Sequence, residues 1–226
     1  MSKISIFSQK IAQTYQKNPF HNWPHWKYVG NAMMVLEWIR SKVSPGRMAW
    51  YFHDADHQWF VQSTDEERAS EIAEIMLRKE GFQKDYIDSV KLHIMGTVFK
   101  QRGCLVLPEQ QLIADADLSK LGSSYRAFVQ NSINYLLEMH PKWEITDREI
   151  EAYFKHNQPW FFNMLTDITG KKETPFLTDI ARVKFPNFSR NKDTLAQDTE
   201  ENLWELISLV RKSEIQPHVR DFRQAA

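Results

Sequence analysis

The stretch Trp50-Tyr51-Phe52-His53-Asp54-Ala55-Asp56-His57-Gln58-Trp59 changes abruptly from aromatic side chains to side chains that bind cations. His53 and His57 offer imidazole nitrogen, and Asp54 and Asp56 offer carboxylate oxygen. Burying such groups beside aromatic residues without partners would cost several kcal/mol. We therefore expect a cation to lie among these four side chains, and this expectation guides the interpretation of the rest of the chain.

Two further polar clusters accompany this stretch. One lies upstream, Phe20-His21-Asn22-Trp23-Pro24-His25, and one lies downstream, Asp115-Ala116-Asp117-Leu118-Ser119-Lys120-Leu121-Gly122. In chain order the clusters give a histidine, then a histidine–aspartate pair, then an aspartate. This order resembles the HD-domain superfamily of metal-dependent phosphohydrolases. The resemblance implies four metal ligands: His25, His53, Asp54 and Asp117.

The motifs are similar to those of one group in this superfamily, the cyclic-nucleotide phosphodiesterases. The similarity lies in residues 21–25, in residues 53–57 and in Asp117-Leu118-Ser119. In that group the first histidine of the first motif donates a proton to the leaving oxygen. The resemblance therefore implies that His21 is a general acid, a role that suits a side chain titrating near neutrality. Asp56 and His57 would then lie near a second metal ion or its water molecules.

A second similarity covers most of the chain and concerns small bacterial proteins described as predicted HD-superfamily phosphohydrolases. It includes Asp65-Glu66-Glu67-Arg68 and implies a catalytic role for Glu66; alternatively, Glu66 is an ordinary carboxylate in the first turn of a helix. The chain departs from this group at Val98-Phe99-Lys100, where another histidine is usual. It departs from the phosphodiesterases in its shorter length.

Asp115 and Asp117 compete for the last ligand position. In the superfamily this ligand is followed by an apolar residue, which favours Asp117-Leu118. Two residues apart on a helix, the side chains point roughly 200° away from each other, so both cannot bind one ion. We therefore expect Asp117 to be the ligand and Asp115 to be a helix cap or an outer group.

A set of two histidines and two aspartates suits a divalent ion such as Mn, Fe, Co, Ni, Zn or, less well, Mg. The resulting interpretation is a metal-dependent phosphohydrolase that cleaves a phosphoester of a small phosphorylated metabolite, with a nucleotide favoured, by means of metal-activated water. Two alternatives stay open. One is a two-metal cyclic-nucleotide phosphodiesterase, and the other is a non-catalytic HD module that only binds a ligand.

Composition narrows the class of protein. The 226 residues fit a single domain, with a core over about 18–140 and a helical extension over about 141–215. Lysine plus arginine balance aspartate plus glutamate at 29 each, so neither long nucleic acid nor an anionic membrane is an expected partner. Cys104 is the only cysteine, which suits a cytoplasmic protein. Formation of a homo-oligomer is left open. Four cations could hold phosphate, but solvated surface positions are favoured for each of them: Lys100, Arg102, Lys120 and Arg126.

Apolar residues recur at helical spacing along the chain, and no stretch shows the alternation of a strand. The sequence therefore predicts an all-α fold, and the resemblance implies that it is an HD-domain helical bundle. His93 falls outside the apolar stripe of its helix and is expected to be satisfied or solvent-facing rather than a ligand. Expected helices cover 3–17, a stretch from about 23, 47–52, 65–80, 86–99, 109–121, 125–139, 147–155, 158–166, 177–182 and a final helix from 198.

Overall fold

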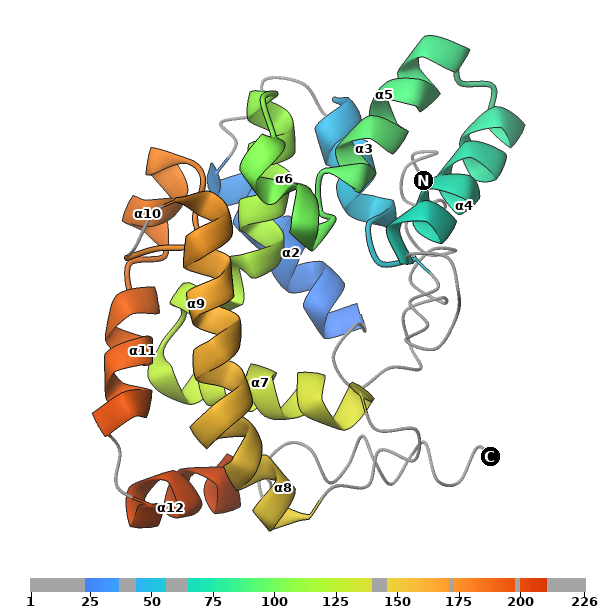
Figure 1. Cartoon of the computed structure of the whole chain (residues 1–226). Coiled ribbons are helices and arrows are strands. Elements are labelled where there is room, and N and C mark those ends of the chain that lie inside the picture. Colours follow the sequence, from blue (N-terminus) through green and yellow to red (C-terminus); the bar gives the residue numbers. More distant parts are fainter. Residues whose placement is uncertain are drawn as a thin grey trace, which may run out of the picture. The chain divides into compact units, whose positions relative to one another are not determined.

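The computed structural model describes residues 23–36, 44–55, 65–139, 146–170, 173–197 and 200–210. Within these ranges every regular element is a helix, so the predicted all-α class is confirmed (Figure 1). The expected helix over 3–17 lies outside the described residues, as does residue 198, where the final helix was expected to begin. Among the described residues, none of the helices is long and apolar enough to cross a membrane.

The chain divides into two compact units. The described part of the first unit runs from residue 23 to residue 118, with gaps, and also includes Phe176–Lys184. The described part of the second unit comprises residues 119–175, with gaps, and the residues from 185 onward. The sequence-based prediction of one domain with a core over about 18–140 stays a prediction.

The first unit begins with the two helices that carry the histidines of interest. Helix α2 covers Trp23–Leu36 and α3 covers Pro45–Phe52, and the two are in contact. Ser44 caps α3 by accepting a hydrogen bond from the Arg47 amide at 3.2 Å. The sequence predicts this helix over 47–52, but α3 begins two residues earlier, because Pro45 and Gly46 lie in its first turn, where proline needs no amide partner.

The other elements of the first unit pack around α3. Helices α4 (Asp65–Lys79) and α5 (Lys84–Met95) contact each other as well as α3, and Gly81 joins them with a positive φ of 81°. A 3-10 helix, η1 (Phe99–Cys104), leads to α6 (Pro108–Asp117), and α6 packs on α2, α3 and α5. The later helix α10 (Asp179–Lys184) contacts α2 and α6. The first unit thus combines segments that are far apart in the sequence.

The second unit has a core of aromatic and aliphatic side chains. Its elements are most of η2 (Leu118–Gly122), α7 (Tyr125–Met139), α8 (Asp147–Ala152), the π-helix η3 (Tyr153–Asn157), α9 (Gln158–Thr169), α11 (Phe188–Gln197) and α12 (Glu200–Val210). The ring of Phe162 lies 5.6 Å from that of Phe128 and 5.3 Å from that of Phe188. The sequence did not predict α11. Most of its residues are polar, and its buried apolar face contains only Phe188 and Leu195.

Candidate metal centre

His25 enters the site from the first turn of α2, as the sequence predicts. The side chain is 1% exposed. Its Nε2 atom lies 3.0 Å from Asp54 Oδ2 and 3.4 Å from Asp117 Oδ1. The buried face of α2, which includes Val29 and Met33, packs in the core of the first unit and so holds His25 in position.

His53 and Asp54 follow directly after α3, where the chain makes a tight turn. The Ala55 amide donates to the Phe52 carbonyl at 2.8 Å, which closes this turn. As a result, neighbouring side chains that would diverge on a regular helix face the same point. His53 Nε2 lies 3.0 Å from Asp54 Oδ2. The predicted helix over 47–52 therefore ends where the structure has it, directly before this pair.

Trp50 fixes how closely α2 and α3 approach. Its indole N–H donates to the Trp26 carbonyl at 3.0 Å, and the two indole rings stack with centroids 4.8 Å apart. The ring occupies the space beside Gly30, where an added Cβ would lie 1.7 Å from Trp50 Cζ2. Glycine at position 30 therefore permits the close approach of α2, which carries His25, and α3, which ends directly before His53.

The carbonyl of Trp50 also determines the tautomer of His53. It lies 2.8 Å from Nδ1 of the imidazole. Because a carbonyl oxygen can only accept, Nδ1 carries a proton. The Nε2 atom of a neutral His53 therefore has its lone pair directed toward the Asp54 and Asp117 carboxylates, the latter at 3.6 Å. This is the arrangement of a histidine that binds a cation through Nε2.

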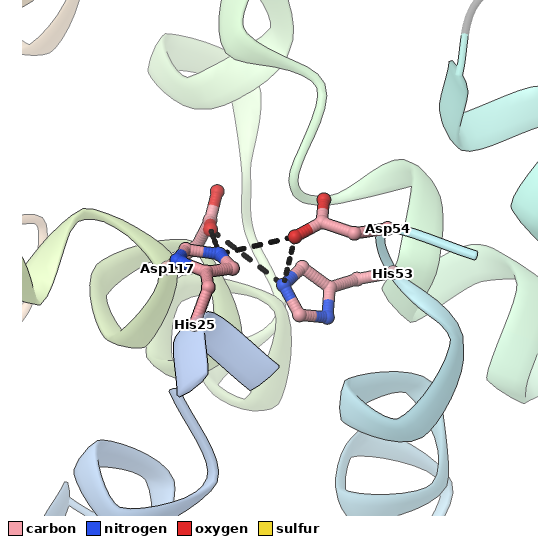
Figure 2. Close-up of side chains that lie close together, drawn as sticks. All are labelled: His25, His53, Asp54 and Asp117. Atoms are coloured by element: carbon pink, nitrogen blue, oxygen red, sulfur yellow. Dashed lines mark ion pairs between the residues drawn. The ribbon is translucent and has the colours of Figure 1, made fainter. Parts of the chain in front are cut away.

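Asp117 is the last residue of α6 and completes a group of four side chains (Figure 2). One ligand atom from each member lies within 4.8 Å of the others, so the group could hold a metal ion. The side chains of Asp54 and Asp117 are 11% and 23% exposed, and both histidines are buried. Three separate parts of the chain thus meet at one partly accessible point. The four members are His25, His53, Asp54 and Asp117.

The electrostatics of the group favour a bound cation. Burial lowers the pKa of His53, but the carboxylates of Asp54 and Asp117 outweigh this effect and raise it well above its usual range. Burial raises the pKa of Asp117, but hydrogen bonds from the two histidines outweigh this and lower it. The nearby Asp54 charge repels Asp117. Positive charge is therefore what the two carboxylates attract, and either protons on the imidazoles or a metal ion can supply it.

The donor set fits a first-row divalent metal. Metal–ligand bonds of about 2.0–2.2 Å place neighbouring ligand atoms roughly 3.0–3.6 Å apart. The four histidine–aspartate separations run from 3.0 to 3.6 Å. Mixed nitrogen and oxygen ligands suit Mn, Fe, Co, Ni or Zn. The identity of the metal stays a prediction.

The remaining sequence-predicted site residues have different outcomes. His21, Asp56 and His57 lie outside the described residues. Glu66 lies in the first turn of α4 and is half-buried; it does not belong to the four-residue group, and its catalytic role stays a prediction. His93 is buried, with Nδ1 at 2.6 Å from the Ser89 carbonyl and Nε2 at 3.2 Å from the carboxylate of Glu109. The expectation that His93 is satisfied is confirmed.

Asp115 is not a member of the group. It is fully buried and accepts hydrogen bonds from Arg102 and from the backbone amides of Leu177 and Thr178, so it is an outer group rather than a ligand. Of the four cations considered for phosphate, Lys100 and Arg126 are exposed, as expected. Arg102 and Lys120 are buried, so the prediction that they are solvated surface charges is wrong. Arg102 is buried because the Asp115 carboxylate neutralises it.

Sequence reasoning missed the pairing of Arg102 with Asp115. Arg102 stands in a polar connection whose pattern carries no sign of burial. Asp115 does carry a signal, since it is flanked by Ile113-Ala114 and Ala116 in a helix where an unpaired carboxylate would be costly. That signal points to a partner, but it does not say which one.

Comparison with known proteins adds no family assignment. No family model matches this chain. No curated protein matches it either. The resemblance to the HD superfamily therefore rests on the three motifs, and it stays a prediction.

Proposed function

We propose that this protein is an HD-type metal-dependent phosphohydrolase that acts on a small phosphorylated metabolite, with a nucleotide as the leading candidate. One observation supports the proposal above all. The four side chains that the motif order selects, from residues 25 to 117, come within reach of a single ion in one unit of the fold. Histidines and aspartates that cluster by chance would not be expected to follow the order of an HD motif along the chain.

The chemistry of phosphoester hydrolysis suits this donor set. A divalent ion, when bound, lowers the pKa of water toward neutrality and offsets negative charge that develops around phosphorus. In this proposal His25, His53, Asp54 and Asp117 hold the ion. A water oxygen attacks phosphorus and releases a proton to solvent, and the bond from phosphorus to the ester oxygen breaks. His21 gives a proton to the leaving oxygen and regains one from solvent. The products are a phosphate and an alcohol.

The test is a metal-dependent screen for phosphate release. Protein stripped with a chelator is supplied in turn with Mn²⁺, Fe²⁺, Co²⁺, Ni²⁺, Zn²⁺ or Mg²⁺ and offered a panel of nucleotides and sugar phosphates. We expect release with at least one metal and none in the stripped protein. Metal binding without any release would instead favour a ligand-binding module. Two ions per chain, with cleavage of cyclic nucleotides, would favour the phosphodiesterase alternative.

The role of His21 can be separated from that of the ligands. In the His21→Asn variant we expect unchanged metal content and turnover lowered by about 10²–10⁴ on ordinary phosphoesters. A nitrophenyl ester has a good leaving group that needs no proton, so its turnover should fall much less. Both substrates are measured on the same preparation, with metal content determined in parallel. Equal losses on both substrates would remove the general-acid role and leave the metal proposal intact.

A further inference from the structure

A second buried polar cluster lies in the same unit as the candidate metal centre. Its middle is the carboxylate of Asp115, which is 0% exposed. Oδ1 accepts from Arg102 Nη2 at 2.9 Å and from the Leu177 amide at 2.8 Å. Oδ2 accepts from the amide and from the hydroxyl of Thr178, both at 2.8 Å. Arg102 also donates from Nη1 to the Ala114 carbonyl at 2.6 Å. One carboxylate therefore accepts four hydrogen bonds.

This cluster joins segments that are distant in the sequence. Arg102 comes from η1, Asp115 from α6, and Leu177 and Thr178 from the residues that lead into α10. The Thr178 hydroxyl in turn accepts from the Ala181 amide at 3.3 Å, in the manner of a helix cap. Helix α10 packs on α2 and on α6. Through α10, Asp115 on α6 is thus linked to α2, which supplies His25.

Asp115 and Asp117 share the last turn of α6. They are two residues apart, so their side chains leave the helix in roughly opposite directions, about 200° apart. Any rotation or shift of this turn that breaks the bonds of Asp115 also moves Asp117. The Arg102 charge also reaches both carboxylates: burial lowers the pKa of Arg102, and Asp115 and Asp117 raise it. The two clusters are therefore linked by the backbone and by the electric field.

We propose that Asp115 is a positioning residue of the candidate metal centre, because it holds the end of α6 in the place from which Asp117 reaches the two histidines. The inference rests on the proposed metal site. Groups around metal ligands that hold those ligands in place typically contribute about 10- to 100-fold to metal affinity. An Asp115 that served stability alone would leave the affinity of the folded protein unchanged.

The test compares metal affinity at a temperature where every variant is folded. Asp115→Asn keeps the size of the side chain but puts an N–H donor where backbone amides also donate. Thr178→Val removes one hydroxyl bond to Asp115 and the cap on Ala181, and Thr178→Ser restores both. Leu77→Ala is the matched control, because Leu77 is fully buried on α4, in the same unit, and its removal costs stability only.

Two readouts distinguish positioning from stability. Calorimetric titration with Mn²⁺ should show about 10- to 100-fold weaker binding in Asp115→Asn. It should show a smaller loss, about fivefold, in Thr178→Val, and near wild-type affinity in Thr178→Ser and Leu77→Ala. The visible absorption of the Co²⁺-loaded protein reports the ligand geometry, and it should change in Asp115→Asn and stay unchanged in Leu77→Ala.

Unchanged affinity and an unchanged Co²⁺ spectrum in Asp115→Asn and Thr178→Val, alongside lowered stability, would overturn the inference. If Asp115→Asn does not fold, the two Thr178 variants decide. A wild-type protein that binds no metal would overturn both this inference and the metal site on which it rests. Metal binding without phosphate release would remove only the catalytic proposal, and weaker binding in the variants would still support the positioning role.

Discussion

Asp115 and Asp117 stand two residues apart on α6, and their surroundings are opposite in kind. The Asp115 carboxylate is fully buried and accepts from a guanidinium, two backbone amides and a hydroxyl. The Asp117 carboxylate is 23% exposed and faces the Nε2 atoms of His25 and His53, close to a second carboxylate. The cluster around Asp115 contains its own positive charge, the guanidinium of Arg102. The candidate metal centre around Asp117 instead attracts a cation from solution.

This difference gives each cluster a distinct role. A buried carboxylate that protein donors satisfy has no lone pair left for a metal, and it holds segments of the chain together. A partly accessible carboxylate among imidazole nitrogens has the arrangement of a metal ligand. Substitutions around Asp115 should therefore lower the free energy of unfolding and weaken metal binding only through the position of Asp117, whereas substitutions among the four metal-ligand candidates should remove metal binding and activity directly.

The largest expected effect comes from Asp54→Ala in the candidate metal centre. Loss of one ligand should lower metal content and reduce phosphate release at least about 10³-fold, since a metal ion contributes several kcal/mol to stabilising the transition state. The free energy of unfolding of the metal-free protein should change by no more than about 1 kcal/mol, because the substitution also removes the repulsion with Asp117. Metal analysis, turnover and chemical denaturation measure the three quantities.

A matched control for Asp54→Ala is Glu74→Gln. Glu74 is an ion-paired carboxylate on α4, held by Arg78 and Lys91. This variant should keep both its metal and its activity, because surface ion pairs contribute little. Equal loss of activity in the two variants would contradict the assignment of Asp54 as a ligand.

The next largest effect is a loss of stability expected in the cluster around Asp115. Arg102→Met leaves the Asp115 carboxylate buried without its countercharge, which should lower the free energy of unfolding by about 3–5 kcal/mol. Denaturant titration of the metal-free protein measures this loss. Removing both charges with Arg102→Met and Asp115→Leu should not restore stability, because the amides of Leu177 and Thr178 would then lack an acceptor. Full recovery in the double variant would show that Asp115 serves only to neutralise Arg102.

The smallest expected effect concerns the packing that aligns the two histidines. Alanine is a better helix former than glycine by about 1 kcal/mol, but a Cβ at residue 30 would overlap the Trp50 ring. Overpacking costs about 1–3 kcal/mol, so Gly30→Ala should be net destabilising and should also weaken metal binding. Thermal denaturation and metal titration test this. Trp50→Phe in the same chain should recover part of the loss, and a stabilised Gly30→Ala would contradict the observed packing.

Much of the fold and of the candidate site could be predicted from the sequence. Helical periodicity is a local property, and α7 was expected over 125–139, where the structure has it. The four-residue group could be expected because the order of its members resembles the HD motif, and that resemblance also implies Asp117 rather than Asp115. Helical periodicity depends on near neighbours in the chain, whereas the group depends on the resemblance of its motifs.

Other features depend on contacts between distant residues. No local pattern links Arg102 to Asp115, or Asp115 to an amide 62 residues further along. The apolar face of α11 is too narrow to stand out among its polar residues, and the mutual fit of Gly30 and Trp50 arises only when α2 crosses α3. Such features are properties of the packed chain, so periodicity and motif spacing could not predict them.

The central claim is that His25, His53, Asp54 and Asp117 bind a divalent metal ion. Its most direct test is denaturation of chelator-stripped protein with and without Mn²⁺ or Zn²⁺, together with counting of bound ions. At a metal concentration 100 times Kd, the wild type should gain about 2.7 kcal/mol and hold one ion at this group. His53→Ala should lose both effects, and His93→Ala, which changes a buried histidine outside the group, should keep them. Failure of the wild type to gain stability, or equal binding by His53→Ala, would contradict the claim.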